Sequence, residues 1–221
     1  MKHTEKELIA LKKGIHEMWK LVLSQLQKAQ ESFLTNNIEI AQEIISRERL
    51  VNAHELKVDY NTENYLALYS PVAVDLRLAL SLIKISSMLE RIGDYAVGIA
   101  RQVQDGDCSE MDQQLVEDLE IEKAFNIVIG MLSDTFVTLE SENTNMAKRI
   151  LARDQEVDVH YRNSIGILTS YLSKNPDQVR CGLNLLLLIR KLERTGDQCS
   201  NIIEEIVFYV DAKVLKHKDS N

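Results

Sequence analysis

Apolar residues recur at steps of three and four along almost the whole chain, which is the period of an amphipathic α-helix. Thr4 and Glu7 form a capping box that predicts where the first helix begins. No segment shows the alternating pattern of a half-buried strand. The apolar stripe of the first helix consists of Leu8, Leu11, Ile15, Met18, Val22 and Leu26. The pattern therefore predicts an all-α protein.

Turn-forming residues divide this pattern into six helices. Asn36-Asn37 separates the first two, Ser70-Pro71 supplies an N-cap with proline at the first helical position, and Asp105-Gly106 stops the third helix. The next three helices begin at Ser109, at Asn143-Thr144 and at Asn175-Pro176. With about 30 residues and a rise of ~1.5 Å per residue, each helix is roughly 45 Å long. Such short connections force neighbouring helices to run antiparallel.

The second half of the chain repeats the first. A shift of 106 residues places Val51 on Val157 and His54 on His160. A shift of 103 places Leu-Glu-Arg-x-Gly-Asp at 89–94 on the same motif at 192–197. Shared leucine and glutamate are expected of any two amphipathic helices, but a shared mid-helix glycine is not. We therefore predict two tandem, pseudo-symmetric three-helix bundles, with residues 1–107 in one and 108–221 in the other.

Composition and charge narrow the function. Hydrophobic residues make up 45% of the chain and aromatic residues 5%, with only 8 glycines and 2 prolines, which favours long helices over sheets. The net charge of -8 argues against nucleic acid and anionic lipid as partners, because both are bound largely through Lys and Arg. An acidic surface suits hard cations or a basic partner.

Three cysteines without a ligand-type spacing predict a reducing compartment. The first residues carry no apolar leader, and no apolar run approaches the ~20 residues that span a bilayer. We therefore expect a soluble, cytoplasmic protein that does not insert into the membrane.

Acidic pairs at matching points of the two halves are the candidate chemistry. Glu90 and Asp94 are four residues apart, as are Glu193 and Asp197, so each pair projects from one helix face. Like charges at this spacing destabilise a helix, and the glycine before each Asp costs a further ~1 kcal/mol. Two explanations remain open. Either the glycine admits a neighbouring helix while Arg or Lys neutralises the acids, or the acids bind a metal ion.

A metal site needs donors from a second helix, because two carboxylates alone are too few. Glu48 and Asn52 in the first half match Asp154 and Asp158 in the second, again four residues apart. An antiparallel neighbour can set these against the pairs above, which gives four oxygen-bearing side chains per bundle. Acidic pairs on helices are also common as solvated or salt-bridged faces. Because Asn52 is neutral, the first site should bind a cation more weakly than the second.

Catalytic patterns are absent from the sequence. Di-iron oxidases use Glu-x-x-His, but the residues three positions before His16, His54, His160 and His217 are not acidic. His54 and His160 lie about 200° around the helix from Asn52 and Asp158, which favours a surface or partner contact over ligation. Arg77 and Arg180 also match each other, and an interbundle salt bridge or a partner contact explains both. We do not expect an enzyme.

The chain resembles the PhoU family of phosphate-signalling regulators over essentially its whole length. The matching segments are SPVAVDLR at 70–77, LERIGD at 89–94, ARDQEVD at 152–158 and ERTGDQCSNIIEEIVFYV at 193–210. The resemblance implies two three-helix bundles whose acidic pairs hold multinuclear iron or zinc clusters, or another divalent cation. By position the ligands would be Glu48, Asn52, Glu90 and Asp94 in one bundle and Asp154, Asp158, Glu193 and Asp197 in the other. Asn52 departs from the acidic pattern.

The resemblance also implies a function. Members are expected to repress the phosphate-starvation response and phosphate uptake without catalysis. They are expected to link the ATPase subunit of the phosphate ABC transporter to the phosphate-sensing histidine kinase, as homodimers recruited from the cytoplasm to the inner face of the membrane. The alternative is a helical protein for metal storage or sensing that has no connection with phosphate.

Overall fold

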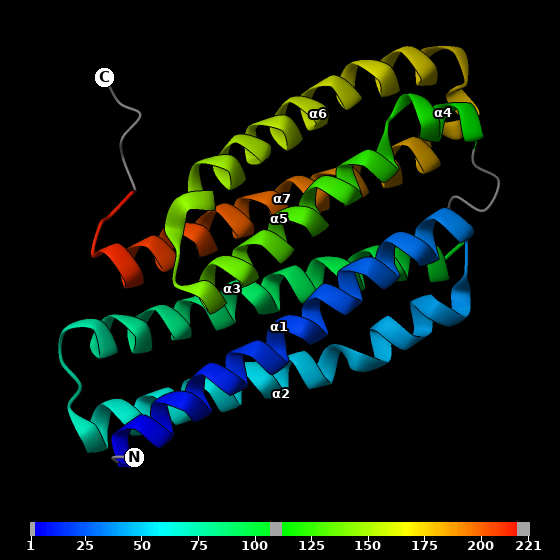
Figure 1. The fold of residues 1–221 in the computed structure, drawn as a ribbon. Coiled ribbons are helices and arrows are strands. Elements are labelled where there is room, and N and C mark those ends of the chain that lie inside the picture. Colours follow the sequence, from blue (N-terminus) through cyan, green and yellow to red (C-terminus); the bar gives the residue numbers. More distant parts are fainter. Residues whose placement is uncertain (1–2, 107–111, 216–221) are drawn as a thin grey trace.

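The computed structural model describes residues 3–106 and 112–215, and within these ranges every regular element is helical (Figure 1). This confirms the predicted all-α class. The α-helices are α1 (His3–Thr35), α2 (Ile38–Tyr69), α3 (Ala73–Gln104), α4 (Gln113–Asp118), α5 (Ile121–Ser141), α6 (Ala147–Lys174) and α7 (Val179–Asp211). Two 3-10 turns, η1 (Thr144–Met146) and η2 (Pro176–Gln178), precede α6 and α7.

The helices form two bundles. α1, α2 and α3 pack against one another, α5, α6 and α7 do the same, and the bundles meet where α3 contacts α7 and α1 contacts α5. In Figure 1, α2 and α6 therefore lie on opposite outer sides of the molecule. The predicted boundary between residues 107 and 108 lies outside the described residues and stays a prediction. Cys108, Ser109 and His217 also lie outside the described residues.

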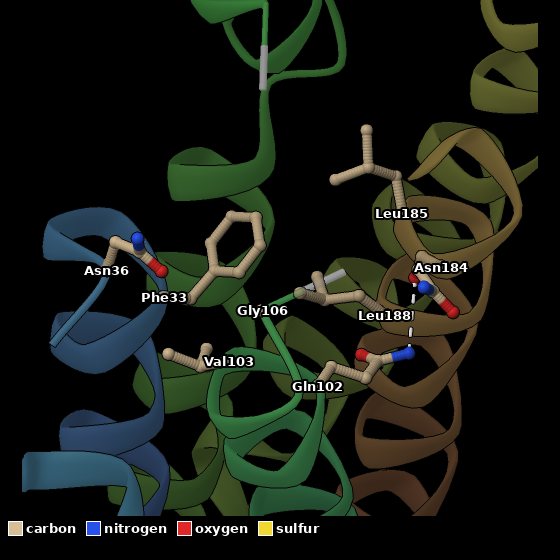
Figure 2. A pocket seen from close by; sticks show the side chains of 8 residues that line it. All are labelled: Phe33, Asn36, Gln102, Val103, Gly106, Asn184, Leu185 and Leu188. Atoms are coloured by element: carbon tan, nitrogen blue, oxygen red, sulfur yellow. Dashed lines mark hydrogen bonds between the residues drawn. The ribbon is translucent and has the colours of Figure 1, made fainter. Parts of the chain in front are cut away.

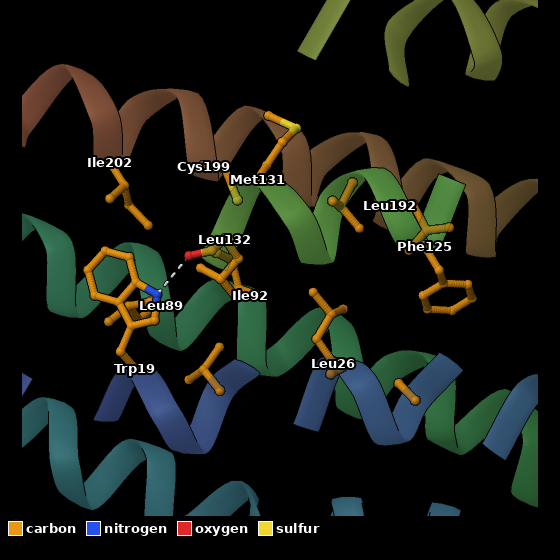
Figure 3. Close-up of a cluster of buried hydrophobic side chains, with 14 of the residues drawn as sticks. Trp19, Leu26, Leu89, Ile92, Phe125, Met131, Leu132, Leu192, Cys199 and Ile202 are labelled. Carbon is orange, nitrogen blue, oxygen red and sulfur yellow. Dashed lines mark hydrogen bonds between the residues drawn. The ribbon is translucent and has the colours of Figure 1, made fainter. Parts of the chain in front are cut away.

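One continuous core joins the two bundles (Figure 3). Trp19 of α1 is fully buried, and its indole Nε1 donates a hydrogen bond to the main-chain oxygen of Leu132 on α5 at 3.1 Å. Around this contact lie buried side chains from α1, α3, α5 and α7: Leu26, Leu89, Ile92, Phe125, Met131, Leu192, Cys199 and Ile202. The apolar stripes of four helices thus face one another, while α2 and α6 cover the outer sides.

The contact between α3 and α7 is antiparallel. Arg77 Nε donates to the main-chain oxygen of Tyr209 at 3.0 Å, and Gln102 Nε2 donates to that of Asn184 at 3.3 Å (Figure 2). As residue numbers rise along α3, those of their partners on α7 fall. The contact of Arg77 does join the bundles, but it is a hydrogen bond to a carbonyl rather than the expected salt bridge.

Most predicted helix ends are confirmed. The side chain of Asn37 accepts hydrogen bonds from the amides of Glu39 and Ile40, which caps α2. Asn143 accepts from the amide of Asn145 at the start of η1. The capping box is wrong, because α1 already includes His3 and Thr4 therefore lies within the helix rather than before it.

The predicted start of the third helix at Ser70 is also wrong. Ser70 ends α2 in the left-handed conformation (φ 43°), and its N–H bonds to the carbonyl of Leu66. α3 begins only at Ala73, after an extended Val72. A residue that precedes proline is disfavoured in the right-handed helical region, so α2 has to end before Pro71.

The fourth predicted helix is not continuous. It is divided into α4 and α5 by Glu120, which adopts a left-handed conformation (φ 44°). Leu119 and Ile121 are both buried, although residues two apart on one helix point about 200° away from each other. The break lets both side chains reach the core, and it sets the short helix α4 ahead of the fourth of the six long helices that the sequence predicts.

Candidate metal centres

The packing of each outer helix against the third helix of its bundle brings the predicted acidic residues together. In the second bundle, Asp154 and Asp158 of α6 face Asp197 of α7. One carboxylate oxygen from each lies within 4.8 Å of the others. Within the described residues, no Lys or Arg side chain forms an ion pair with any of the three. Oxygen ligands of one cation sit about 2.0–2.6 Å from it, so this spacing fits a shared ion.

Because Gly196 has no side chain, the Asp154 carboxylate can lie directly against its backbone. A Cβ added to Gly196 would lie 2.7 Å from Asp154 Oδ1, closer than side chains normally approach. Oδ2 of the same carboxylate accepts a hydrogen bond from Ser200 at 2.7 Å, whereas Oδ1 is buried without a protein partner. An unpartnered buried carboxylate oxygen calls for a proton, a water molecule or a cation. The mid-helix glycine therefore makes room for an acid.

Burial and mutual repulsion disturb the ionisation of this cluster. Burial raises the pKa of Asp154 to about 6. The charges of Asp197, Asp158 and Glu193 also raise it, whereas the hydrogen bond from Ser200 lowers it. The pKa values of Glu193 and Asp197 are also raised, in each case mainly by burial. Glu193 Oε2 is a second buried oxygen without a protein partner. All four oxygen donors of the second bundle therefore interact, and their chemistry fits a hard or borderline cation.

The corresponding residues of the first bundle are less well assembled. Glu48 forms an ion pair with Arg101 of α3 at 2.9 Å, and Asn52 is exposed. Burial raises the pKa of Glu90 to about 7, helped by the charges of Asp94 and Glu55 and by its hydrogen bond to Asp94. The salt-bridge explanation thus holds for Glu48, whose carboxylate is paired with the guanidinium group of Arg101. The first bundle therefore has the carboxyl pair of Glu90 and Asp94 on α3, but the predicted donors on α2 are ion-paired (Glu48) or exposed and neutral (Asn52).

Glu55 is a residue of this cluster that the sequence reasoning missed. Its pKa is raised mainly by burial and further by the charges of Asp59 and Asp94. Asp59 in turn accepts a hydrogen bond from Ser86 Oγ on α3 at 2.9 Å. Glu55 lies seven residues after Glu48, which is two helical turns, so its spacing alone could have placed it on the same face. The acidic surface of the first bundle therefore extends further along α2 than the predicted pair.

The two motif glycines have different surroundings. A Cβ on Gly93 would lie 3.2 Å from a methyl group of Val51 and 3.3 Å from the amide oxygen of Gln25. Gly93 thus permits close helix packing, as the structural explanation predicts, while Gly196 accommodates a carboxylate. Gln25 is fully buried, and neither of its amide atoms has a protein partner.

His160 lies away from the acidic cluster, as its angular position predicts. Its Nε2 is 2.7 Å from the main-chain oxygen of Leu119, at the break between α4 and α5. The histidine therefore contacts the break rather than a metal site.

Sequence and structure comparisons agree with the arrangement of two helical bundles. The family model described as "PhoU domain" matches residues 15–103 and 121–206. The phosphate-specific transport system accessory protein PhoU of Edwardsiella tarda is 30% identical over 211 residues, covering 96% of this chain and 86% of the relative. Its homolog from Aquifex aeolicus is 29% identical over 213 residues, covering 96% and 95%.

The crystal structure of PhoU from Pseudomonas aeruginosa superposes with a TM-score of 0.89 at 27% identity, covering 95% of this chain and 99% of that one. The architecture is thus that of a tandem helical-bundle protein. The chain belongs to the PhoU family. Over the part of the chain that the structure describes, no helix combines the length and apolar character needed to traverse a membrane.

Proposed function

We propose that this protein is a non-catalytic negative regulator of phosphate uptake and of the phosphate-starvation response. The observation that carries the proposal is similarity over 96% of the chain to a protein named a phosphate-specific transport system accessory protein. The match includes both acidic motifs and both bundles, rather than one shared helix pair.

In this proposal the protein acts as an adaptor between the ATPase subunit of the phosphate ABC transporter and the phosphate-sensing histidine kinase. It works as a homodimer in the cytoplasm and reaches the inner face of the membrane through these partners. Long helices joined by one core give it rigid faces suited to holding two proteins at once.

We also propose that the acidic clusters bind metal, as multinuclear iron or zinc clusters or as another divalent cation. The ligands would be Asp154, Asp158, Glu193 and Asp197 in the second bundle. In the first bundle they would be Glu48, Asn52, Glu90 and Asp94. A bound cation would neutralise carboxylates that otherwise repel one another, which would hold α6 against α7. The unpartnered oxygens and the space beside Gly196 support the second site more strongly than the first.

Deleting the gene tests the regulatory role. Cells grown in rich phosphate should then show raised alkaline phosphatase activity and raised phosphate uptake, and the intact gene on a plasmid should restore both. Unchanged phosphatase and uptake in the deletion strain would refute the proposal.

Metal analysis tests the second proposal and the alternative function. Purified protein reconstituted with Fe²⁺ or Zn²⁺ should retain metal after desalting, and Glu90→Ala with Glu193→Ala should reduce the stoichiometry. Equal retention by the variant would refute these ligands. The acidic cluster with its unpartnered oxygen also favours, as a second candidate, metal storage or sensing without a role in phosphate. Normal phosphate control in a deletion strain with altered metal tolerance would support that candidate instead.

A further inference from the structure

A groove runs beside the break between α4 and α5, on the side of the second bundle away from α7. Its volume is about 550 Å³, and α4–α5 forms one wall while α6 forms the other. The residues that line it are Asp118, Leu119, Glu120, Lys123, Ile127, Ala152, Gln155, Glu156, Val159, His160, Asn163, Ser164 and Ile167. None of the proposed metal ligands is among them.

The groove is apolar inside and acidic at its edges. The partly buried Ile127 and Ile167 contribute apolar surface to it, and Val159 is 47% exposed. Burying an exposed aliphatic side chain of this kind against a partner is favourable by roughly 25 cal/mol per Å² of apolar surface. An apolar centre with a polar rim is the usual arrangement of protein–protein interfaces.

The charge at the edges is negative. Glu120 is paired with Lys123 at 2.9 Å, so those two charges compensate each other. Asp118 and Glu156 remain as exposed carboxylates without an ion pair among the described residues. Two adjoining hollows share Lys123 with this groove and add Glu117 and Glu122 to its border, together with Arg153, which is paired with Asp134. A third hollow shares Asp118 with the groove and carries Arg162 and Lys174, so the border is acidic along α4–α5 and at Glu156 and basic only towards that end. The whole chain also carries a net charge of -8, which favours a basic partner.

The break in the helix fixes one wall of the groove. Glu120 interrupts the helix with its left-handed backbone, and the His160 ring meets the Leu119 carbonyl at 2.7 Å across the groove. α1, the corresponding helix of the first bundle, is continuous from His3 to Thr35. The second bundle therefore departs from the internal symmetry at this groove, although both bundles carry the same acidic motif.

We propose that this groove docks an amphipathic helix of a partner protein, with aliphatic side chains on its inner face and Lys or Arg along both edges. Helices commonly bind apolar grooves through residues spaced three and four apart. Basic edges complement the acidic rim, and such complementarity sets specificity and association rate. The inference rests on the proposed adaptor role, and assigns this groove to one of the two partners.

Binding between purified proteins tests the groove. The chain is titrated with the transporter ATPase subunit and with the soluble part of the kinase. Two groove variants are compared with wild type: Val159→Glu, and Asp118→Lys combined with Glu156→Lys. All three residues are substantially exposed or lie on the rim, so the variants should fold, which circular dichroism verifies. The matched control is Leu56→Glu with Glu63→Lys on the exposed face of α2.

For one partner, each groove variant should raise the Kd at least tenfold, while the control stays within twofold of wild type. Binding of both partners at wild-type affinity by both groove variants would overturn the proposal and leave the adaptor role intact. If the wild-type chain binds neither partner, the adaptor role fails, and the groove proposal fails with it. A photo-crosslinking residue at position 159 identifies the docked segment. Capture of an acidic or non-helical segment would also overturn the proposal.

Discussion

Replacing Gly196 with alanine should weaken metal binding at the second cluster while leaving the fold almost unchanged. The added Cβ would lie 2.7 Å from Asp154 Oδ1, so the carboxylate has to move by about 0.7 Å to reach an ordinary contact distance. Metal sites tolerate shifts of only about 0.2 Å in ligand distance. Asp154 would therefore leave the coordination sphere of a bound cation or distort it.

The opposing effects on stability can be worked out from the same contact. Alanine is better than glycine in a helix interior by ~1 kcal/mol. Displacing Asp154 endangers its hydrogen bond from Ser200, and a hydrogen bond to a charged group contributes ~1.5–3 kcal/mol. Because the displaced carboxylate regains water, the loss is only part of that. The free energy of unfolding of the metal-free protein should therefore change by no more than about 1 kcal/mol.

Calorimetric titration with Zn²⁺ and urea unfolding separate the two effects. Metal affinity at the second site should fall by about 10- to 100-fold, the range seen when the support of a metal ligand is disturbed. Gly166→Ala on α6 is the control, because a Cβ there meets nothing within 4 Å and should stabilise the chain by up to ~1 kcal/mol without changing affinity. Unchanged Zn²⁺ affinity in Gly196→Ala would refute the reasoning that this glycine makes room for a ligand.

Three further predictions concern the acid cluster, the core and the first metal site. The pKa of Asp154 is raised to about 6 in the folded protein, so its protonation stabilises the fold below pH ~4, and this contribution of at most ~3 kcal/mol is lost as the pH rises through 6. Asp154→Asn should flatten that loss of stability in urea unfolding of metal-free protein between pH 4 and 8. An equal decline in the variant would contradict the prediction. Trp19→Phe should lower the free energy of unfolding by about 1–3 kcal/mol, measured by thermal or urea unfolding, because it leaves the Leu132 carbonyl without its indole donor and opens space in the core. Wild-type stability of the variant would show that the contact is dispensable. Asn52→Asp, which restores the match with Asp158, should raise Zn²⁺ affinity at the first site at least tenfold in an Asp154→Asn background, and no change would argue against α2 as a source of ligands.

The helical class, the tandem arrangement and most helix ends follow from the sequence, because they depend on local physical chemistry. The three- and four-residue apolar period and the side chains of Asn37 and Asn143 act within a few residues of their own positions. The predicted helix start at Ser70 and the predicted continuity of the fourth helix were wrong, because constraints other than the local apolar period act at Ser70 and at Glu120. Pro71 constrains the residue before it, and Leu119 and Ile121 both have to reach the core.

The candidate site divides in the same way. The spacing of Glu90 with Asp94, and of Glu193 with Asp197, could be read from the sequence, since four residues make about one helical turn. The duplication also pointed to the second helix of each bundle as the neighbour of these pairs, but the register and the distance between the helices are fixed only by packing. Packing alone places Asp154 in the space beside Gly196.

By itself, the sequence determined that each half carries a glycine between acidic residues, and it left the same two explanations open for both glycines. Tertiary structure decided that Gly93 admits Val51 of a neighbouring helix while Gly196 admits the carboxylate of Asp154. It also decided that Glu48 pairs with Arg101 and that Glu55 joins the first cluster. The physical reason is that helical periodicity fixes where a side chain points on its own helix. What it meets depends on the approach of a second helix, which no local pattern encodes.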